Sequence, residues 1–247
     1  MDVPEHLALA RTRDMLDGIL VETGATEYRM YLSDHLENNF RFKIDPQYKA
    51  NRENQPKPLH HEAIGNYLKE ECQAIVAVGQ EADDALGIDQ STAYGEGTSS
   101  WEKAVEGDME LVLNLSTMIC SIDKDLLQIP GLHYNFVKKE SFEQNPHDGL
   151  IHFYSQLLIG DRVDNIFGVY GLGPKKTEAC LRGCDTEEEM FEVVRGLYMD
   201  DARLLKNGCL LWIKRTETDN WKDHFVGLGG EVPELSLQKE LSAPGLY

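Results

Sequence analysis

Cysteine, long apolar runs and positive charge are all scarce in this 247-residue sequence. The five cysteines are odd in number and show no Cys-x-x-Cys spacing, which argues against a disulfide framework and favours a reducing compartment, with the cytoplasm as the expected location. No apolar run reaches the roughly 18–20 residues that a bilayer-spanning helix needs. The first residues lack the basic and apolar regions of a signal peptide. We therefore expect no membrane partner.

Positive charge is outnumbered, with 24 Lys and Arg against 43 Asp and Glu and a formal net charge of −19. This weighs against a protein that binds phosphates through a broadly basic surface. Two interpretations stay open. The Asp and Glu side chains either form a solvated acidic surface, or some of them are gathered into a divalent-metal site that mediates phosphate binding.

The order of the elements predicts an α/β fold. The wholly apolar segment 74–78 is typical of a buried parallel strand, and 117–121 is predicted as the next buried strand. Further strands are predicted at 27–32 and 132–137, helices at 4–22 and 59–72, an irregular basic loop at 39–58, and a partly helical insertion at 89–110. From about residue 147 the pattern is helical, with helices predicted at 147–159, 174–182, 186–198 and 199–214 before a loose tail. Strands alternating with helices and followed by helices alone indicate a parallel sheet with a helical C-terminal part.

Acidic clusters follow both buried strands, and a third pair lies in the helical part. The carboxyl ends of parallel strands meet at one edge of a sheet, so the first two clusters are expected there together. The third pair is three residues apart, which on a helical turn would point both carboxylates the same way. Such a cluster needs cations, because like charges a few ångströms apart repel. An all-oxygen set favours two Mg²⁺ or Mn²⁺ ions. The expected ligands are Glu81, Asp83, Asp84, Asp123, Asp125, Asp161 and Asp164.

A glycine-rich turn directly follows the third pair. Glycines allow the backbone to approach a ligand closely, and Pro174 suits the first turn of a helix. Free N–H groups at a helix N-terminus, with lysines beside them, suit a phosphate. The expected phosphate contacts are Gly168, Gly171, Gly173, Lys175 and Lys176.

Four ordered motifs carry a resemblance to a known family. They are Tyr-Lys-x-Asn-Arg at 48–52, Glu-x-Asp-Asp at 81–84, Asp-x-Asp at 123–125 and Gly-Asp-x-x-Asp at 160–164. Residues 25–182 thereby resemble the flap endonucleases and bacteriophage 5′→3′ exonucleases. The resemblance implies a PIN-like metal-binding α/β domain over 1–140. It also implies a helical region over 141–247, with a helix–three-turn–helix at about 158–182.

The resemblance also implies residue roles and an activity. Lys49 and Arg52 would reach the scissile phosphate, with Tyr48 beside them at the DNA, and Asp34 would join the metal ligands. A K⁺ ion would assist the hairpin. The implied activity is two-metal hydrolysis of DNA at 5′ ends, flaps and branched duplexes. Its setting would be phage DNA replication or degradation in the host cytoplasm.

One departure from the family pattern leaves alternatives open. Family members begin with a strand that ends in a metal-binding aspartate, whereas this sequence opens with a predicted helix. Either the start is truncated, or a separate chain supplies the strand, or the first metal site lacks one ligand. The alternative function is a catalytically weak or inactive protein that binds branched DNA. A third is a related 5′-nuclease acting on RNA–DNA hybrids.

Overall fold

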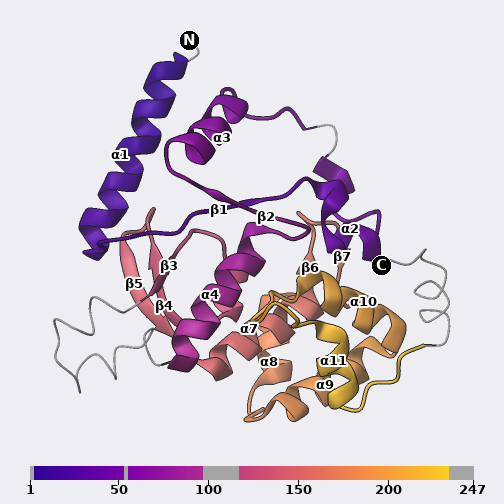
Figure 1. Cartoon of the computed structure of the whole chain (residues 1–247). Helices are drawn as coiled ribbons and strands as arrows, with labels where there is room; N and C mark the ends of the chain where they lie inside the picture. The colour runs from indigo at the N-terminus through magenta and orange to yellow at the C-terminus, as the bar shows by residue number, and fades with distance from the viewer. Residues whose placement is uncertain (1–2, 53–54, 97–116, 234–247) are drawn as a thin grey trace, which may run out of the picture.

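The computed structural model describes residues 3–52, 55–96 and 117–233 of the chain. Its first half mixes strands and helices, and its second half is mainly helical (Figure 1). The strands are β1 (Tyr31–Ser33), β2 (Ile75–Ala77), β3 (Met118–Cys120), β4 (Gly131–Asn135), β5 (Glu140–Gln144), β6 (Gly160–Asp161) and β7 (Ile166–Phe167). The helices of the first half are α1 (Glu5–Thr23), α2 (Phe40–Ile44), α3 (His61–Glu70) and α4 (Ala82–Glu96). Those of the second half are α7 (Pro146–Ile159), α8 (Pro174–Leu181), α9 (Glu187–Tyr198), α10 (Asp201–Leu211) and α11 (Trp221–Gly227). The expected α/β fold with a helical C-terminal part is confirmed.

The strands of the first half form two small sheets. β1 pairs with β2 in parallel, and β3 pairs with β4 in parallel while β5 returns antiparallel to β4. Helix α4 contacts strands of both sheets and so holds them in one unit. Among the described residues no strand joins β2 to β3. The predicted parallel sheet is therefore present as two pieces, whose strand ends face the second half.

Helices α7, α9, α10 and α11 of the second half begin at side-chain caps that the sequence supplies. Asn145 caps α7 by accepting from the Asp148 N–H, and Pro146 occupies its first turn. Thr186 and Glu189 form a capping box at the start of α9. These caps satisfy N–H groups that lack a partner within the helix. They explain why the helices predicted at 147–159 and 186–198 are confirmed almost to the residue.

The main hydrophobic core lies in this helical half. Phe153, Tyr154 and Phe191 are fully buried, and Trp212 and Trp221 pack among them with ring centroids 5.5 Å apart. A smaller core under α4 contains Ile119, Leu126, Ile129 and Ile213. The last of these comes from the segment after α10, so the end of the helical half also packs against the α/β half.

Several predicted boundaries are wrong. The strand predicted at 27–32 runs instead from Tyr31 to Ser33. Strand β5 was not predicted, because it has a single large apolar residue, and it extends the β4–β5 hairpin to Gln144. The division into domains at residue 140 stays a prediction. The basic segment 39–58 contains the short helix α2 and a 3₁₀ turn at Ala50–Arg52. Helix α11 replaces part of the predicted loose tail.

The insertion predicted at 89–110 is only partly tested. Helix α4 continues through residues 89–96, and the remainder of that prediction lies outside the described residues. None of the described helices is long and apolar enough to cross a membrane. Helix α1 contacts α3 and, through Glu22, Tyr134 of β4 and Lys139 of the β4–β5 turn.

Candidate active site

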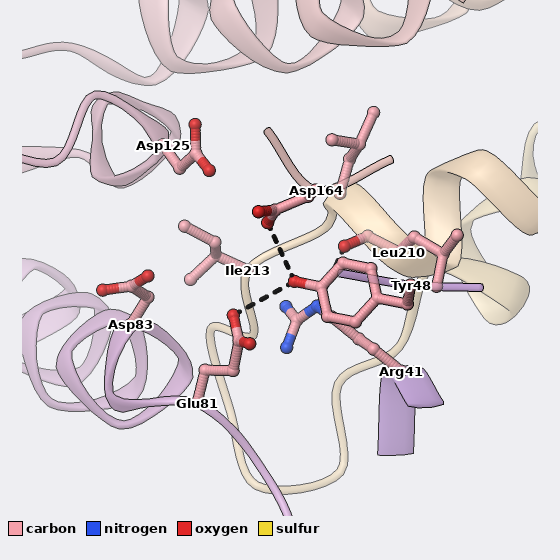
Figure 2. Close-up of a pocket in the computed structure, with 9 residues that line it drawn as sticks. Arg41, Tyr48, Glu81, Asp83, Asp125, Asp164, Leu210 and Ile213 are labelled. Carbon is pink, nitrogen blue, oxygen red and sulfur yellow. Dashed lines mark hydrogen bonds between the residues drawn. The ribbon is translucent and has the colours of Figure 1, made fainter. Parts of the chain in front are cut away.

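A polar pocket lies where the two halves meet. It is lined by Arg41, Tyr48, Glu81, Asp83, Asp125 and Asp164, with Leu210, Leu211 and Ile213 as its apolar wall. Figure 2 shows the four carboxylates around one space, with the Tyr48 hydroxyl reaching between Glu81 and Asp164. Glu81 precedes α4 and Asp83 lies in its first turn, Asp125 follows β3, and Asp164 lies between β6 and β7. Three distant segments therefore converge on one site, as the acidic motifs predicted.

The third acidic pair lies in a hairpin and not on the helical turn that we expected. Gly160 ends α7 at a φ of 78°, and β6 and β7 then pair antiparallel through Asp161 and Ile166. The Oδ1 atom of Asp161 accepts from the Val163 N–H at 2.7 Å and from the Asp164 N–H at 3.3 Å. These bonds tighten the turn and bring both carboxylates to one side of it.

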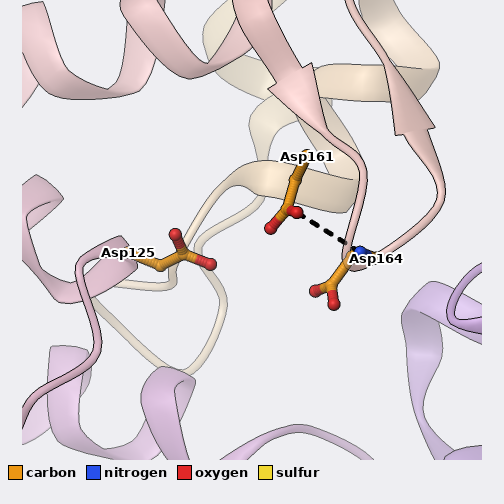
Figure 3. A group of neighbouring side chains, drawn as sticks. All are labelled: Asp125, Asp161 and Asp164. Carbon is orange, nitrogen blue, oxygen red and sulfur yellow. Dashed lines mark hydrogen bonds between the residues drawn. The ribbon is translucent and has the colours of Figure 1, made fainter. Parts of the chain in front are cut away.

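Three carboxylates are arranged as a metal would require. Ligand atoms of Asp125, Asp161 and Asp164 all lie within 4.8 Å of one another (Figure 3). Carboxylate oxygens are the ligands that hard divalent cations prefer. The residues present therefore fit a divalent metal ion. Glu81 and Asp83, across the same pocket, extend the oxygen-rich wall.

Burial and crowding make this cluster costly without a cation. Burial, together with the charges of Asp123 and Glu81, raises the pKa of Asp83 to about 7. Burial and the neighbouring Asp123 and Asp161 raise the pKa of Asp125 to about 6. Burial also raises the pKa of Asp164, against the opposing effect of nearby cations. Perturbed carboxyl groups gathered in one pocket are typical of functional sites.

Two basic side chains supply those nearby cations. The Nζ atom of Lys49 pairs with Glu81 and lies 3.6 Å from Asp164 Oδ2, and Arg52 Nη2 pairs with Asp164 Oδ1. The Lys49 backbone adopts a φ of 57° and donates its N–H to the Asp164 carbonyl at 3.1 Å. The Tyr-Lys-x-Asn-Arg motif is therefore docked directly on the carboxylates.

Tyr48 plays a different part from the one expected. It is only 2% exposed, so in this conformation its ring contacts protein and cannot contact DNA, which corrects the prediction of a DNA contact. Its Oη lies 3.2 Å from Glu81 Oε2 and 3.1 Å from Asp164 Oδ2. Burial and the charge of Glu81 raise the pKa of Tyr48, so the phenol stays protonated. Its O–H donates a hydrogen bond to one carboxylate at a time. It links the two sides of the pocket.

Two expected ligands lie near the pocket without lining it. Asp123 accepts the Asp125 N–H at 3.0 Å and is close enough to raise the pKa values of Asp83 and Asp125. Asp34 accepts from the Gly79 N–H at 2.9 Å and from Asn38 Nδ2 at 3.1 Å, which lowers its pKa. Asp34 thus fastens the loop after β1 to the loop after β2. Their expected roles as ligands stay predictions.

Asp84 has partners of its own. It is fully buried, and Arg41 Nη1 and Nη2 donate to its two oxygens at 2.5 and 2.9 Å. The sequence alone places Arg41 in an irregular basic loop and does not predict this buried ion pair. The available signal was its position between Phe40 and Phe42, two large apolar residues.

The glycine-rich hairpin leads from β7 into α8. Gly171 has a φ of 79°, Gly173 caps α8, and Lys175 and Lys176 are exposed at its first turn. Lys176 Nζ donates to the Gly171 carbonyl at 2.9 Å. Gly168 serves packing, because an added Cβ would meet the Gly160 backbone nitrogen at 2.5 Å.

Tyr170 at the tip of this hairpin was not predicted as a site residue. Its side chain is fully exposed, with a relative exposure of 101%. An exposed aromatic in a segment that also carries two exposed lysines can stack on a nucleic-acid base. The only sequence signal was its place between two glycines of the motif.

We compared the sequence with those of known proteins. No protein-family model matches the chain. DNA polymerase I of Pseudomonas aeruginosa is 32% identical over 161 residues, which cover 58% of this chain and 15% of that protein. DNA polymerase I of Borreliella burgdorferi is 29% identical over 213 residues, covering 79% and 21%. The chain thus spans about a fifth or less of the curated relatives it matches.

Solved structures match over most of their length. The bacteriophage T5 D15 protein co-crystallised with metal ions has a TM-score of 0.60 at 17% identity, covering 84% of this chain and 82% of that one. A T5 D15 flap endonuclease complex with DNA and metal ions has a TM-score of 0.58 at 15% identity, covering 89% of each chain. The resemblance found in the sequence is confirmed: this chain has the fold of the bacteriophage T5 flap endonuclease and 5′-exonuclease.

Proposed function

We propose that this chain is a divalent-metal-dependent 5′-nuclease that hydrolyses DNA phosphodiesters at 5′ ends and flap junctions. The observation that carries the proposal is the cluster of three carboxylates, from Asp125, Asp161 and Asp164, with Lys49 and Arg52 beside it. Anionic groups would hold metal, and adjacent cations would hold a phosphate. The DNA-bound and metal-bound T5 structures of the same fold support both parts.

The metal set we propose is two Mg²⁺ ions, with Mn²⁺ as a substitute. Asp125, Asp161 and Asp164 would hold one ion, and Glu81 and Asp83 across the pocket would hold the other. When bound, two such ions supply Lewis acidity to the attacking and leaving oxygens of a phosphodiester. A K⁺ ion at the hairpin stays a prediction. In this structure the Gly171 carbonyl, which could face such an ion, accepts a hydrogen bond from Lys176.

The chain's own residues then bind and orient the substrate. Lys49 and Arg52 sit at the pocket, so a phosphate arriving there would exchange with the carboxylates they now pair with. The hairpin N–H groups with Lys175 and Lys176 are placed to hold duplex backbone outside the pocket. Tyr48 keeps Glu81 and Asp164 at a fixed separation.

A second candidate is a protein that binds branched DNA and cuts slowly or not at all. The observation favouring it is that β2 and β3 belong to separate sheets among the described residues, with no strand there to present a further aspartate. A separate chain that supplies such a strand remains part of this proposal. A 5′-nuclease acting on RNA–DNA hybrids stays a third possibility, which substrate comparison would decide.

Cleavage of a labelled 5′-flap oligonucleotide tests the first proposal. Wild-type protein should release short labelled products with Mg²⁺ or Mn²⁺ and none with EDTA. Asp125→Asn should abolish cleavage while leaving the shifted DNA band in a gel. Glu188→Gln, an exposed carboxyl change in the helical half, is the matched control and should cut normally. Metal-dependent band shifts without products would favour the second candidate, and cleavage in EDTA would overturn the first.

A further inference from the structure

Asp84 differs from the other carboxylates of its motif in its surroundings. Glu81 and Asp83 line the pocket, whereas Asp84 does not line it and is fully buried beneath it. A carboxylate offers about four lone-pair sites for hydrogen bonds or metal. Four donors already take them. They are Arg41 Nη1 at 2.5 Å, Arg41 Nη2 at 2.9 Å, the Glu81 N–H at 3.2 Å and the Lys214 N–H at 3.2 Å.

Four of the five N–H donors of the Arg41 guanidinium have protein acceptors. Arg41 is 3% exposed, and besides its bidentate pair with Asp84 it donates from Nε to the Leu210 carbonyl at 2.9 Å. Its Nη2 also donates to the Trp212 carbonyl at 2.7 Å. The guanidinium therefore joins the start of α2 to the end of α10. These are segments about 170 residues apart in the sequence.

The pair also fixes the segment that carries two pocket carboxylates. Asp84 Oδ2 accepts the Glu81 N–H, so the first turn of α4 is closed by a side chain that Arg41 holds from below. Close approach of α4 to the chain after α10 needs Gly87, where an added Cβ would meet the Lys214 carbonyl at 2.5 Å. Shifting Asp84 would therefore move Glu81 and Asp83 together.

We infer that Asp84 is a positioning residue and not a metal ligand. Its pairing with Arg41 locks α2, α4 and the chain after α10 in place whether or not metal is bound, and so presents Glu81 and Asp83 to the pocket. The effect on metal binding rests on the proposed function. The pairing itself does not.

Thermal unfolding in EDTA at pH 8 tests the pairing. Breaking a buried ion pair from one side leaves a buried charge without its partner, so Asp84→Asn should lower the midpoint by roughly 6–20 °C. Asp83→Asn, one residue away but facing like charges in the pocket, is the matched control and should raise it. Arg41→Lys keeps the charge and should give an intermediate loss. Arg41→Gln combined with Asp84→Asn, a neutral pair, should recover part of the loss. An Asp84→Asn midpoint that is unchanged or raised would overturn the pairing.

Calorimetric titration with Mn²⁺ tests the positioning, at a temperature well below every midpoint. Asp84→Asn should bind the same number of ions about tenfold more weakly, as removal of a supporting side chain does. Loss of one bound ion would make Asp84 a ligand, and an unchanged affinity would make it structural only. Either result overturns the inference.

These experiments distinguish failure of the inference about Asp84 from failure of the proposed function. A wild-type chain that binds Mn²⁺ but cuts no DNA would remove the nuclease proposal and leave this inference standing. A wild-type chain that binds no Mn²⁺ would remove both the nuclease proposal and the positioning role, while the unfolding experiment would still decide the pairing.

Discussion

Replacing Asp83 with asparagine should stabilise the metal-free protein at pH 8 and leave it nearly unchanged at pH 4. The pKa of Asp83 is raised from 3.8 to about 7, so the folded state binds this proton more tightly than the unfolded state does. The associated stability is fully present below pH 4 and is lost as the pH rises through 7. Three pKa units correspond to about 4 kcal/mol. Because Asp83 shares the pocket with other titrating carboxyls, we expect about 2–4 kcal/mol at pH 8.

The assay is urea unfolding in EDTA at half-unit steps from pH 4 to pH 8.5. Wild-type stability should fall across this range by up to about 1.4 kcal/mol per pH unit for each such group, and the Asp83→Asn profile should fall less steeply. Adding Mn²⁺ at pH 8 should stabilise the wild type more than the variant, because the variant has lost one anionic group. Parallel profiles for wild type and variant in EDTA would refute the reasoning.

Three further changes test separate parts of the site. Lys49→Met should tighten Mn²⁺ binding several-fold without DNA, because its ammonium occupies the carboxylates, yet slow flap cleavage; weaker Mn²⁺ binding in calorimetry would contradict this. Gly168→Ala should lower the melting temperature by roughly 4–12 °C through a clash with the backbone of Leu158 and Gly160, where α7 ends and β6 begins. Gly173→Ala, with open space around it, should change the melting temperature little. Tyr48→Phe removes a buried donor and should cost about 1 kcal/mol in urea unfolding, together with slower cleavage; unchanged values in both would show that its hydroxyl is dispensable.

Local signals in the sequence were sufficient for much of the fold. The helices after residue 145 carry their own caps in Asn145 and Thr186, so their starts were predictable. Gly24, with a φ of 67°, ends α1 close to the end of the helix predicted at 4–22. The apolar residues at 74–78 and 118–120 indicated β2 and β3, and therefore the two strand ends after which Asp83 and Asp125 reach the pocket.

Elements without a local signal were missed. Apolar and polar residues alternate poorly along β5, and this segment is a strand because it pairs with β4. Helix α11 is short, and it is held by Trp221, which is 1% exposed in the main core. The hairpin at Asp161 and Asp164 was mistaken for a helical turn, because a spacing of three suits both a helix and a tight turn.

The sequence by itself indicated that three acidic motifs gather at one site, because two of them follow buried strands and the third precedes a glycine-rich turn. It could not determine what each carboxylate does there. Asp83 faces like charges and Asp84 faces Arg41, although the two are neighbours in one motif. Successive residues on a helix point about 100° apart, so their surroundings come from different parts of the chain. Only the tertiary structure, by bringing Arg41 and the chain after α10 beneath α4, decided which of them lines the pocket and which supports it.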